Sequence, residues 1–194
     1  VNSYSGALLN ESKLISEQEM KQISSLDSVS PILGVFEKPT FKTDFSTDLL
    51  LALDDVRDPG NMGTIIRLAD WFGVKTIFCS PNCVDVFNSK VVQSTMGSLT
   101  NVNLISQNLA NAFAEAKKES FYVVGAEMKG TTLSKFKTDK KLMLVMGNEA
   151  NGICLENQKS LDESVTIEKA ITSQAESLNV AMAASILLGG LTSR

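Results

Sequence analysis

Three short segments of the chain carry polar side chains at the edges of apolar runs. They comprise residues 61–67, 147–152 and 177–181, and each combines glycine or a short polar residue with Asn, Glu, Ser or Arg. Proteins keep such side chains out of their cores unless the side chains are paired or take part in chemistry. Three such segments in 194 residues predict a single site assembled from distant parts of the sequence.

Each segment taken alone also permits a plainer interpretation. The guanidinium of Arg67 suits a phosphate or a carboxylate, yet this segment also reads as a helix capped by Asn61 with a surface arginine. Glu149 follows an apolar strand, where α/β proteins bind ligands, although an ordinary strand-to-helix turn would look the same. Ser177 is expected to cap the last helix, which leaves Asn179 to point into the site.

Histidine is absent from the chain. This absence excludes Ser-His-Asp and Cys-His nucleophilic systems and leaves catalysis to Asn, Ser, Glu, Arg, Lys or a cofactor. No metal site is expected, because no histidine could complete one around Cys79 and Cys83, and ordinary packing accounts for both thiols. Neither a phosphate-binding loop of the Gly-x4-Gly-Lys type nor a Gly-x-Gly-x-x-Gly dinucleotide fingerprint is present.

The net charge of −4 argues against a non-specific nucleic-acid binder. Positive charge is nevertheless concentrated in residues 129–141, which contain five lysines and one aspartate. A solvated loop face is the first interpretation of this cluster, and a phosphate-contacting edge is the second. No run approaches about 18 apolar residues, so no membrane span is expected.

Apolar strands and helices alternate from residue 49 onward, which indicates an α/β fold with a parallel sheet covered by helices on both faces. The last helix is apolar almost all round and is expected to pack in a core or against a second subunit. Residues 1–45 differ: capping and helical signals occupy residues 11–20, a strand is predicted at 31–36, and a linker follows. The predicted strands are 49–53, 76–79, 121–126, 142–146 and 165–167, and the predicted helices are 61–72, 88–97, 109–118, 155–161 and 178–188.

Together the three segments resemble the SpoU class of the SPOUT methyltransferases, which transfer methyl from S-adenosylmethionine to a ribose 2′-hydroxyl of RNA. The resemblance covers residues 49–188 in order and spacing, including residues 85–92 and 96–98. It implies a catalytic domain over residues 46–194 with a C-terminal trefoil knot, acting as a homodimer through its last helix. The three cysteines, an odd number, suit a reducing cytoplasm. Residues 1–45 resemble the end of a small substrate-binding domain similar to ribosomal protein L30e, together with a linker, and the lack of an initiator methionine suggests that the rest of that domain is missing.

The resemblance also implies a role for each site residue. We expect Arg67 to bind phosphate and stabilise the forming alkoxide, since a guanidinium is hard to deprotonate, and water to take or share the proton. The family's proline and glycine are absent from residues 167–174, so Ile171 could replace Ile167 beside the adenine. The catalytic residues implied are Arg67, Asn61, Glu149, Ser177 and Asn179, and the residues implied to hold the cofactor are Met146, Gly147, Ile167, Ile171 and Leu178.

The substrate implied is RNA, with ribosomal RNA favoured over transfer RNA by the L30e-like segment. Two other functions remain open at this point. One is a non-catalytic RNA-binding relative, against which the intact polar residues of all three segments argue. The other is a nucleotide-dependent α/β enzyme, against which the absent fingerprints argue.

Overall fold

The computed structural model describes residues 12–24, 26 and 28–192 and divides the chain into two units, Val1–Pro39 and Thr40–Arg194. In the first unit, helix α1 (Glu17–Ile23) begins with a capping box between Ser16 and Glu19, which confirms the helical signals. The strand predicted at residues 31–36 is wrong, and this segment is irregular. The described part of this unit offers its backbone no neighbouring strand, and the side chains of Val35 and Phe36 are exposed.

The second unit is built on a six-stranded sheet in the order β3-β2-β1-β5-β4-β6, and every neighbouring pair is parallel. This arrangement confirms the predicted parallel sheet. Strand β3 was not predicted, because polar residues at both of its ends leave only two apolar residues between them. The strands are β1 (Leu49–Leu53), β2 (Thr76–Cys79), β3 (Asn103–Ser106), β4 (Phe121–Thr132), β5 (Lys141–Met146) and β6 (Glu163–Thr166).

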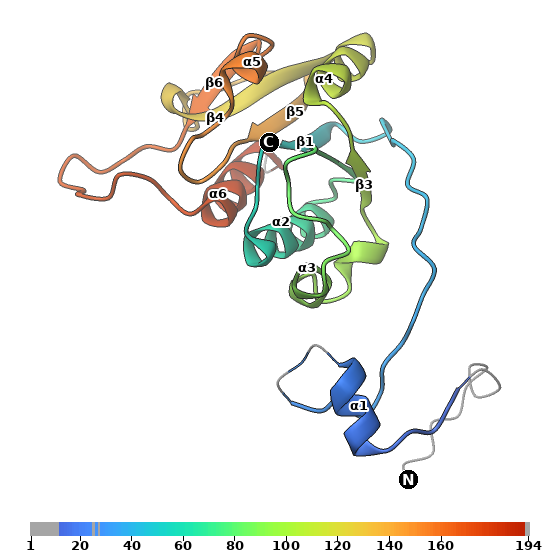
Figure 1. The fold of residues 1–194 in the computed structure, drawn as a ribbon. Coiled ribbons are helices and arrows are strands. Elements are labelled where there is room, and N and C mark those ends of the chain that lie inside the picture. Colours follow the sequence, from blue (N-terminus) through green and yellow to red (C-terminus); the bar gives the residue numbers. More distant parts are fainter. Residues whose placement is uncertain (1–11, 25, 27, 193–194) are drawn as a thin grey trace. The chain divides into compact units, whose positions relative to one another are not determined.

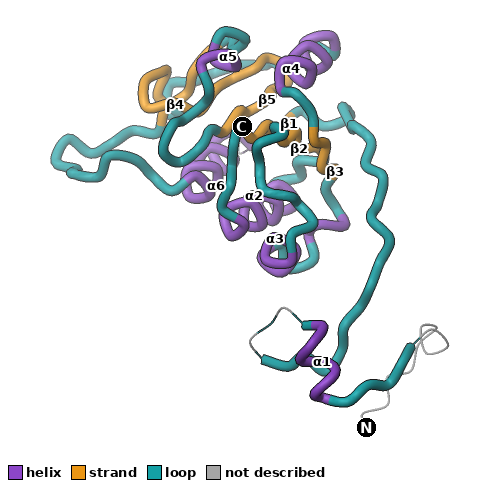
Figure 2. Tube along the Cα trace, in the orientation of Figure 1, coloured by secondary structure: helices purple, strands orange, loops and turns teal. Residues whose placement is uncertain are grey.

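Helices cover both faces of this sheet, with α2, α3 and α6 on one side and α4 and α5 on the other (Figure 1, Figure 2). Among residues 12–24, 26 and 28–192, no helix combines the length and apolar character that crossing a membrane requires. The helices of this unit are α2 (Pro59–Trp71), α3 (Ser89–Ser94), α4 (Leu109–Lys118), α5 (Leu155–Gln158) and α6 (Val180–Thr192), with a short 3₁₀ helix η2 (Ser98–Thr100).

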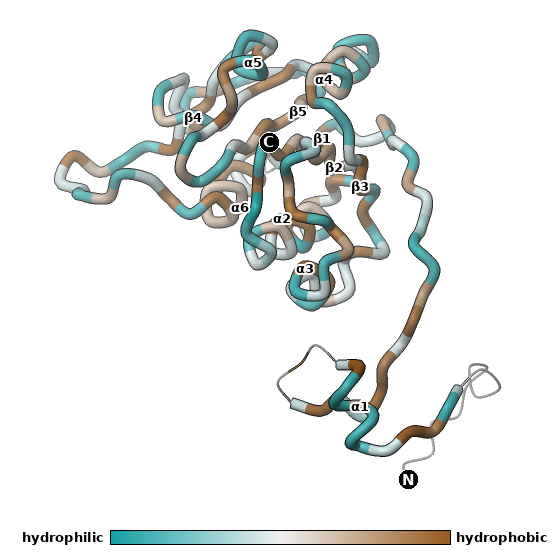
Figure 3. The backbone as a smooth tube through the Cα atoms, viewed as in Figure 1, coloured by the Kyte–Doolittle hydropathy of each residue, from teal (hydrophilic) through white to brown (hydrophobic). Residues whose placement is uncertain are grey.

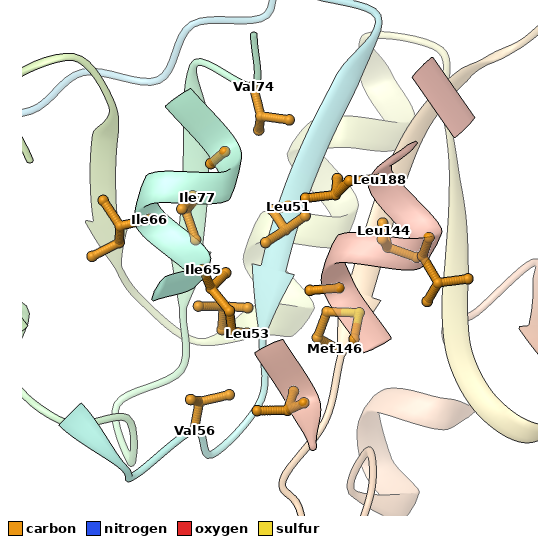
Figure 4. Packing of buried hydrophobic residues seen from close by; sticks show 14 of the residues in the cluster. Leu51, Leu53, Val56, Ile65, Ile66, Val74, Ile77, Leu144, Met146 and Leu188 are labelled. Carbon is orange, nitrogen blue, oxygen red and sulfur yellow. The ribbon is translucent and has the colours of Figure 1, made fainter. Parts of the chain in front are cut away.

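The core has two layers because successive side chains of a strand point to opposite faces. In β1, Leu51 packs with α2 and α6, whereas Leu50 packs with α4 in the second cluster. Figure 4 shows Leu51 between Ile65 of α2 and Leu188 of α6. The central strands are accordingly hydrophobic along most of their length in Figure 3. Burial of each such side chain stabilises the fold by about 1.5–3 kcal/mol.

Helix α2 runs close to α3 because Gly63 has no side chain. A Cβ atom at Gly63 would lie 2.8 Å from the carbonyl oxygen of Val91 and would also overlap Ser94. The start of α2 is therefore held against its neighbour as well as against the sheet. This close packing fixes the direction in which the first turn of α2 presents its side chains.

Candidate active site

One residue from each of the three polar segments takes part in a single hydrogen-bonded group, here called the polar triad. Asn61 Nδ2 donates to Glu149 Oε1 at 2.7 Å, and Asn179 Nδ2 donates to Asn61 Oδ1 at 2.9 Å. Asn61 lies in the first turn of α2, Glu149 in the loop after β5, and Asn179 directly before α6. The structure thus brings together polar side chains that are 88 and 118 residues apart in the sequence.

The start of α2 determines where Asn61 points. Asp58 is the N-cap residue, since its Oδ1 accepts a hydrogen bond from the backbone nitrogen of Asn61 at 2.7 Å, and Pro59 follows as the first helical residue. The prediction that Asn61 caps this helix is wrong, because the helix begins two residues earlier. The amide of Asn61 is consequently available to Glu149 and Asn179.

Asn179 connects the polar triad to α6. Its Oδ1 accepts hydrogen bonds from the backbone nitrogens of Ala181 at 3.0 Å and Met182 at 3.2 Å, while its Nδ2 donates to Asn61. The capping residue of α6 is therefore Asn179, and the expectation that Ser177 caps it is wrong. Ser177 lies three residues before the helix, exposed to solvent.

The loop after β5 closes on itself. The backbones of Asn148 and Gly152 exchange hydrogen bonds of 3.0 and 2.9 Å, and the side chain of Asn148 accepts from two further backbone nitrogens inside the loop. Gly152 has a φ of +67°, a conformation that favours glycine. A Cβ on Gly147 would overlap the backbone of Gly152 and Ile153. The sequence analysis did not identify Asn148 as the residue that closes this loop. An Asn after a strand-end glycine is a known signal for such a turn, because its side chain accepts from backbone nitrogens two or three residues on.

A cavity of about 1010 Å³ lies beside this loop, between the middle of β4, the carboxyl ends of β5 and β6, and α6. Glu149 and Ser177 line it. Four of the five residues expected to hold a cofactor also line it: Met146, Gly147, Ile167 and Leu178.

Ile171 lies outside this cavity lining, and its side chain is fully exposed. It occupies a turn closed by a hydrogen bond from Ser173 N to Ala170 O, within the irregular segment that leads from β6 to α6 (Figure 1). The structure therefore supports Ile167 rather than Ile171 as the cavity residue of this segment.

Arg67 is not part of the polar triad. It lies six residues after Asn61 on α2, which at about 100° per residue directs it to a different side of the helix. Its side chain is exposed and forms no ion pair with the described residues. Any function of Arg67 must therefore be exercised on a molecule outside this subunit.

Two thiols lie at the carboxyl end of β2. The pKa of Cys83 is lowered to about 7, chiefly by a hydrogen bond with Cys79, and the same contact together with burial raises the pKa of Cys79. Cys83 Sγ also donates to the carbonyl oxygen of Leu53 at 3.3 Å. The part of the chain that the structure describes holds no cluster of three or more His, Cys, Asp or Glu side chains suited to a metal ion.

Comparison with known proteins places this geometry in a family. The model of the SpoU rRNA Methylase family matches residues 48–189. The chain belongs to this family. Its membership confirms the resemblance drawn from the three polar segments and removes the nucleotide-dependent enzyme as an alternative.

Individual SpoU relatives agree in sequence and in structure. The 23S rRNA (guanosine(2553)-2′-O)-methyltransferase RlmP of Bacillus subtilis is 31% identical over 176 residues, which cover 90% of this chain and 70% of that protein. A putative RNA methyltransferase of the TrmH family from Porphyromonas gingivalis superposes with a TM-score of 0.74 at 34% identity, covering 88% of this chain and 69% of the other. AviRb from Streptomyces viridochromogenes, solved with AdoMet, gives 0.68 at 28% identity, covering 74% of this chain and 59% of the other.

These relatives confirm the activity class, an RNA 2′-O-methyltransferase, and the methyl donor, S-adenosylmethionine. The chain spans less than two thirds of several further relatives, down to 38% of one of them. The cavity suits the donor chemically. Its apolar residues, such as Met146, Ile167 and Leu178, can enclose an adenine. The negative carboxylates of Glu127 and Glu149 attract the positive charge of a sulfonium.

Proposed function

We propose that this protein transfers the methyl group of S-adenosylmethionine to a ribose 2′-hydroxyl of ribosomal RNA. The polar triad of Asn61, Glu149 and Asn179 beside the cavity carries the proposal, because it presents hydrogen-bonding groups where donor and ribose must meet. The names of relatives such as RlmP and RlmB, both 23S rRNA methyltransferases, support ribosomal RNA over transfer RNA.

Methyl transfer to a hydroxyl is an in-line displacement. The 2′-oxygen bonds to the methyl carbon as the carbon–sulfur bond breaks, and the hydroxyl proton leaves to water. The protein must therefore align the oxygen and hold the ribose. Glu149 suits this task, since Asn61 occupies its Oε1 and no described residue donates to its Oε2, which can accept a ribose hydroxyl.

Asn61 and Asn179 keep Glu149 in this orientation, because the backbone nitrogen of Asn61 is held by the cap of α2 and the side chain of Asn179 caps α6. S-adenosylmethionine supplies the activated methyl group. Met146, Gly147, Ile167 and Leu178 would hold it, and Ser177 would contact donor or ribose from the wall of the cavity.

We further propose that the active protein is a homodimer and that Arg67 acts on RNA bound at the second copy. Arg67 is exposed and directed away from the polar triad of its own subunit. The outer side of α6 exposes Met182 by 59% and Ile186 by 44%, an apolar surface suited to a second helix. At the active site of the second copy, the planar guanidinium of Arg67 would bind an RNA phosphate and stabilise the forming alkoxide.

Three further expectations complete this proposal. The chain forms a trefoil knot, which is supported by the crossing of residues 167–179 from the sheet edge at β6 to α6, packed against α2. Residues 1–45 are the end of an L30e-like RNA-binding domain and its linker. An RNA substrate is consistent with a cytoplasmic location.

The test is transfer of a tritiated methyl group to total RNA from cells that lack this protein, followed by mapping of the labelled nucleotide. Label in ribosomal RNA at a ribose supports the proposal. A full-length protein that binds S-adenosylmethionine in calorimetry but labels no RNA would contradict it. Absence of donor binding together with RNA binding would instead support the non-catalytic relative.

A further inference from the structure

Asp54 is a buried carboxylate that the proposed chemistry does not use. It follows β1 directly and is only 5% exposed. Its Oδ2 accepts two hydrogen bonds, from the backbone nitrogen of Cys154 at 2.8 Å and from Nδ2 of Asn157 at 2.9 Å. Asn157 is itself only 8% exposed. Both donors belong to the segment that follows the closed loop of residues 147–152.

Asp54 and Asp55, which directly follow β1, also hold the start of the loop of residues 147–152. The backbone nitrogen of Asp54 donates to the carbonyl oxygen of Met146 at 2.8 Å, and the carbonyl oxygen of Asp55 accepts from Nδ2 of Asn148 at 2.8 Å. Asp54 and Asp55 therefore attach residues 146–157 to the end of β1 on both sides of Glu149. These contacts fix both ends of the loop to the residues that follow β1.

We propose that Asp54 is a positioning residue for the methyl-donor cavity. Its carboxylate fixes residues 153–157 and, together with the contact of Asn148, sets the place of the loop that lines the cavity and carries Glu149. Asp54 itself lies outside the cavity lining, so it acts through the loop. This inference rests on the proposed function, because the ligand whose affinity it affects is S-adenosylmethionine.

Removal of the carboxylate leaves the buried side-chain amide of Asn157 and the partly buried backbone nitrogen of Cys154 without an acceptor. The Asp54→Ala variant is expected to bind S-adenosylmethionine about tenfold more weakly, which corresponds to ~1.4 kcal/mol. The Asp54→Asn variant keeps an acceptor oxygen at the same place. Its affinity is expected to stay within about threefold of the original, since both hydrogen bonds can form again.

A control exists at the far end of α2. There Asp70 Oδ2 accepts from Nδ2 of Asn101 at 3.1 Å, an Asp–Asn pair that is exposed rather than buried and lies away from the cavity. The Asp70→Ala variant is expected to keep the original affinity for S-adenosylmethionine. Affinities are measured by calorimetry well below each variant's thermal midpoint, so that unfolded protein does not contribute. In turnover, Asp54→Ala is expected to raise KM for S-adenosylmethionine and to lower kcat, because the same loop carries Glu149, whereas Asp70→Ala is expected to change neither.

A folded Asp54→Ala protein with unchanged affinity would overturn the inference, and so would an equal loss in Asp70→Ala. If Asp54→Ala does not fold, the Asn157→Ala variant tests the inference instead, because it removes one of the two groups that donate to Asp54. That variant is expected to weaken binding about threefold, and unchanged affinity would count against Asp54. An unsubstituted protein that fails to bind S-adenosylmethionine would contradict the proposed function instead.

Discussion

Replacement of Gly147 by alanine would put a methyl group into space that the backbone of Gly152 and Ile153 already occupies. Backbone atoms cannot rotate away as a side chain can, so the loop must open. Opening breaks the two hydrogen bonds between Asn148 and Gly152, of 3.0 and 2.9 Å. At about 0.5–1.5 kcal/mol for each hydrogen bond, the loss in unfolding free energy is ~1–3 kcal/mol.

For a domain of this size a change of 1 kcal/mol shifts the thermal midpoint by about 2–4 °C, so Gly147→Ala is expected to unfold about 2–12 °C earlier. The larger consequence concerns ligand binding, because the same loop lines the cavity. Affinity for S-adenosylmethionine is expected to fall by about tenfold or more, measured by calorimetry below the thermal midpoint.

Gly73→Ala provides the control for destabilisation alone. Gly73 has a φ of +74° and no atom within 4 Å of its Cβ position, so alanine there meets backbone strain of about 1–2 kcal/mol without a clash. This variant is expected to lose thermal stability to a similar degree and to keep its affinity for S-adenosylmethionine. A Gly147→Ala protein with unchanged affinity would refute the reasoning, as would an equal loss of affinity in Gly73→Ala.

Three further variants or measurements test other parts of the site. Arg67→Lys is expected to lower kcat at least about tenfold without changing affinity for S-adenosylmethionine, since lysine lacks the planar fork, and full turnover would contradict the role given to Arg67. Asp58→Ala removes the cap of α2 and is expected to cost about 1 kcal/mol, seen in denaturant unfolding, and to lower kcat because Asn61 loses its anchor. Alkylation of Cys83, whose pKa is lowered to about 7, is expected to accelerate as the pH rises through 7, whereas burial raises the pKa of Cys154 from its ordinary value and its reaction should accelerate only at higher pH. A rate for Cys83 that rises only above pH 9 would contradict the contact with Cys79.

The sheet could be predicted because its evidence is local. Strand β1 is an uninterrupted apolar run, and α4 was predicted with the bounds that the structure shows, Leu109–Lys118. Strand β3 was missed, because its two apolar residues give little local signal and the strand forms by pairing with β2. Strand β4 was predicted too short, because its extension depends on resumed pairing with β6 after an irregularity at residues 126–131.

At α2 and α6, an N-cap was expected but was assigned to the wrong residue. The residue types suited to an N-cap occur twice near each helix start, as Asp58 and Asn61 and as Ser177 and Asn179. Local sequence does not show which of them precedes the first helical residue and accepts from its free backbone amides. The error matters for the site, because a residue that caps has one polar atom committed to the backbone. Asp54 was not singled out at all, since its partners lie 100 and 103 residues further along the chain.

Asn179 shows why the site and the last helix cannot be varied independently. One atom of its amide caps α6 and the other bonds Asn61, so any shift of α6 moves the polar triad with it. The same helix exposes Met182 and Ile186, the surface proposed for a second copy. Dimer formation would therefore hold α6, and through Asn179 it would hold Asn61 and Glu149. On this reasoning, substitution of Ile186 by a charged residue should lower kcat together with dimer content, even though Ile186 lies outside the donor cavity.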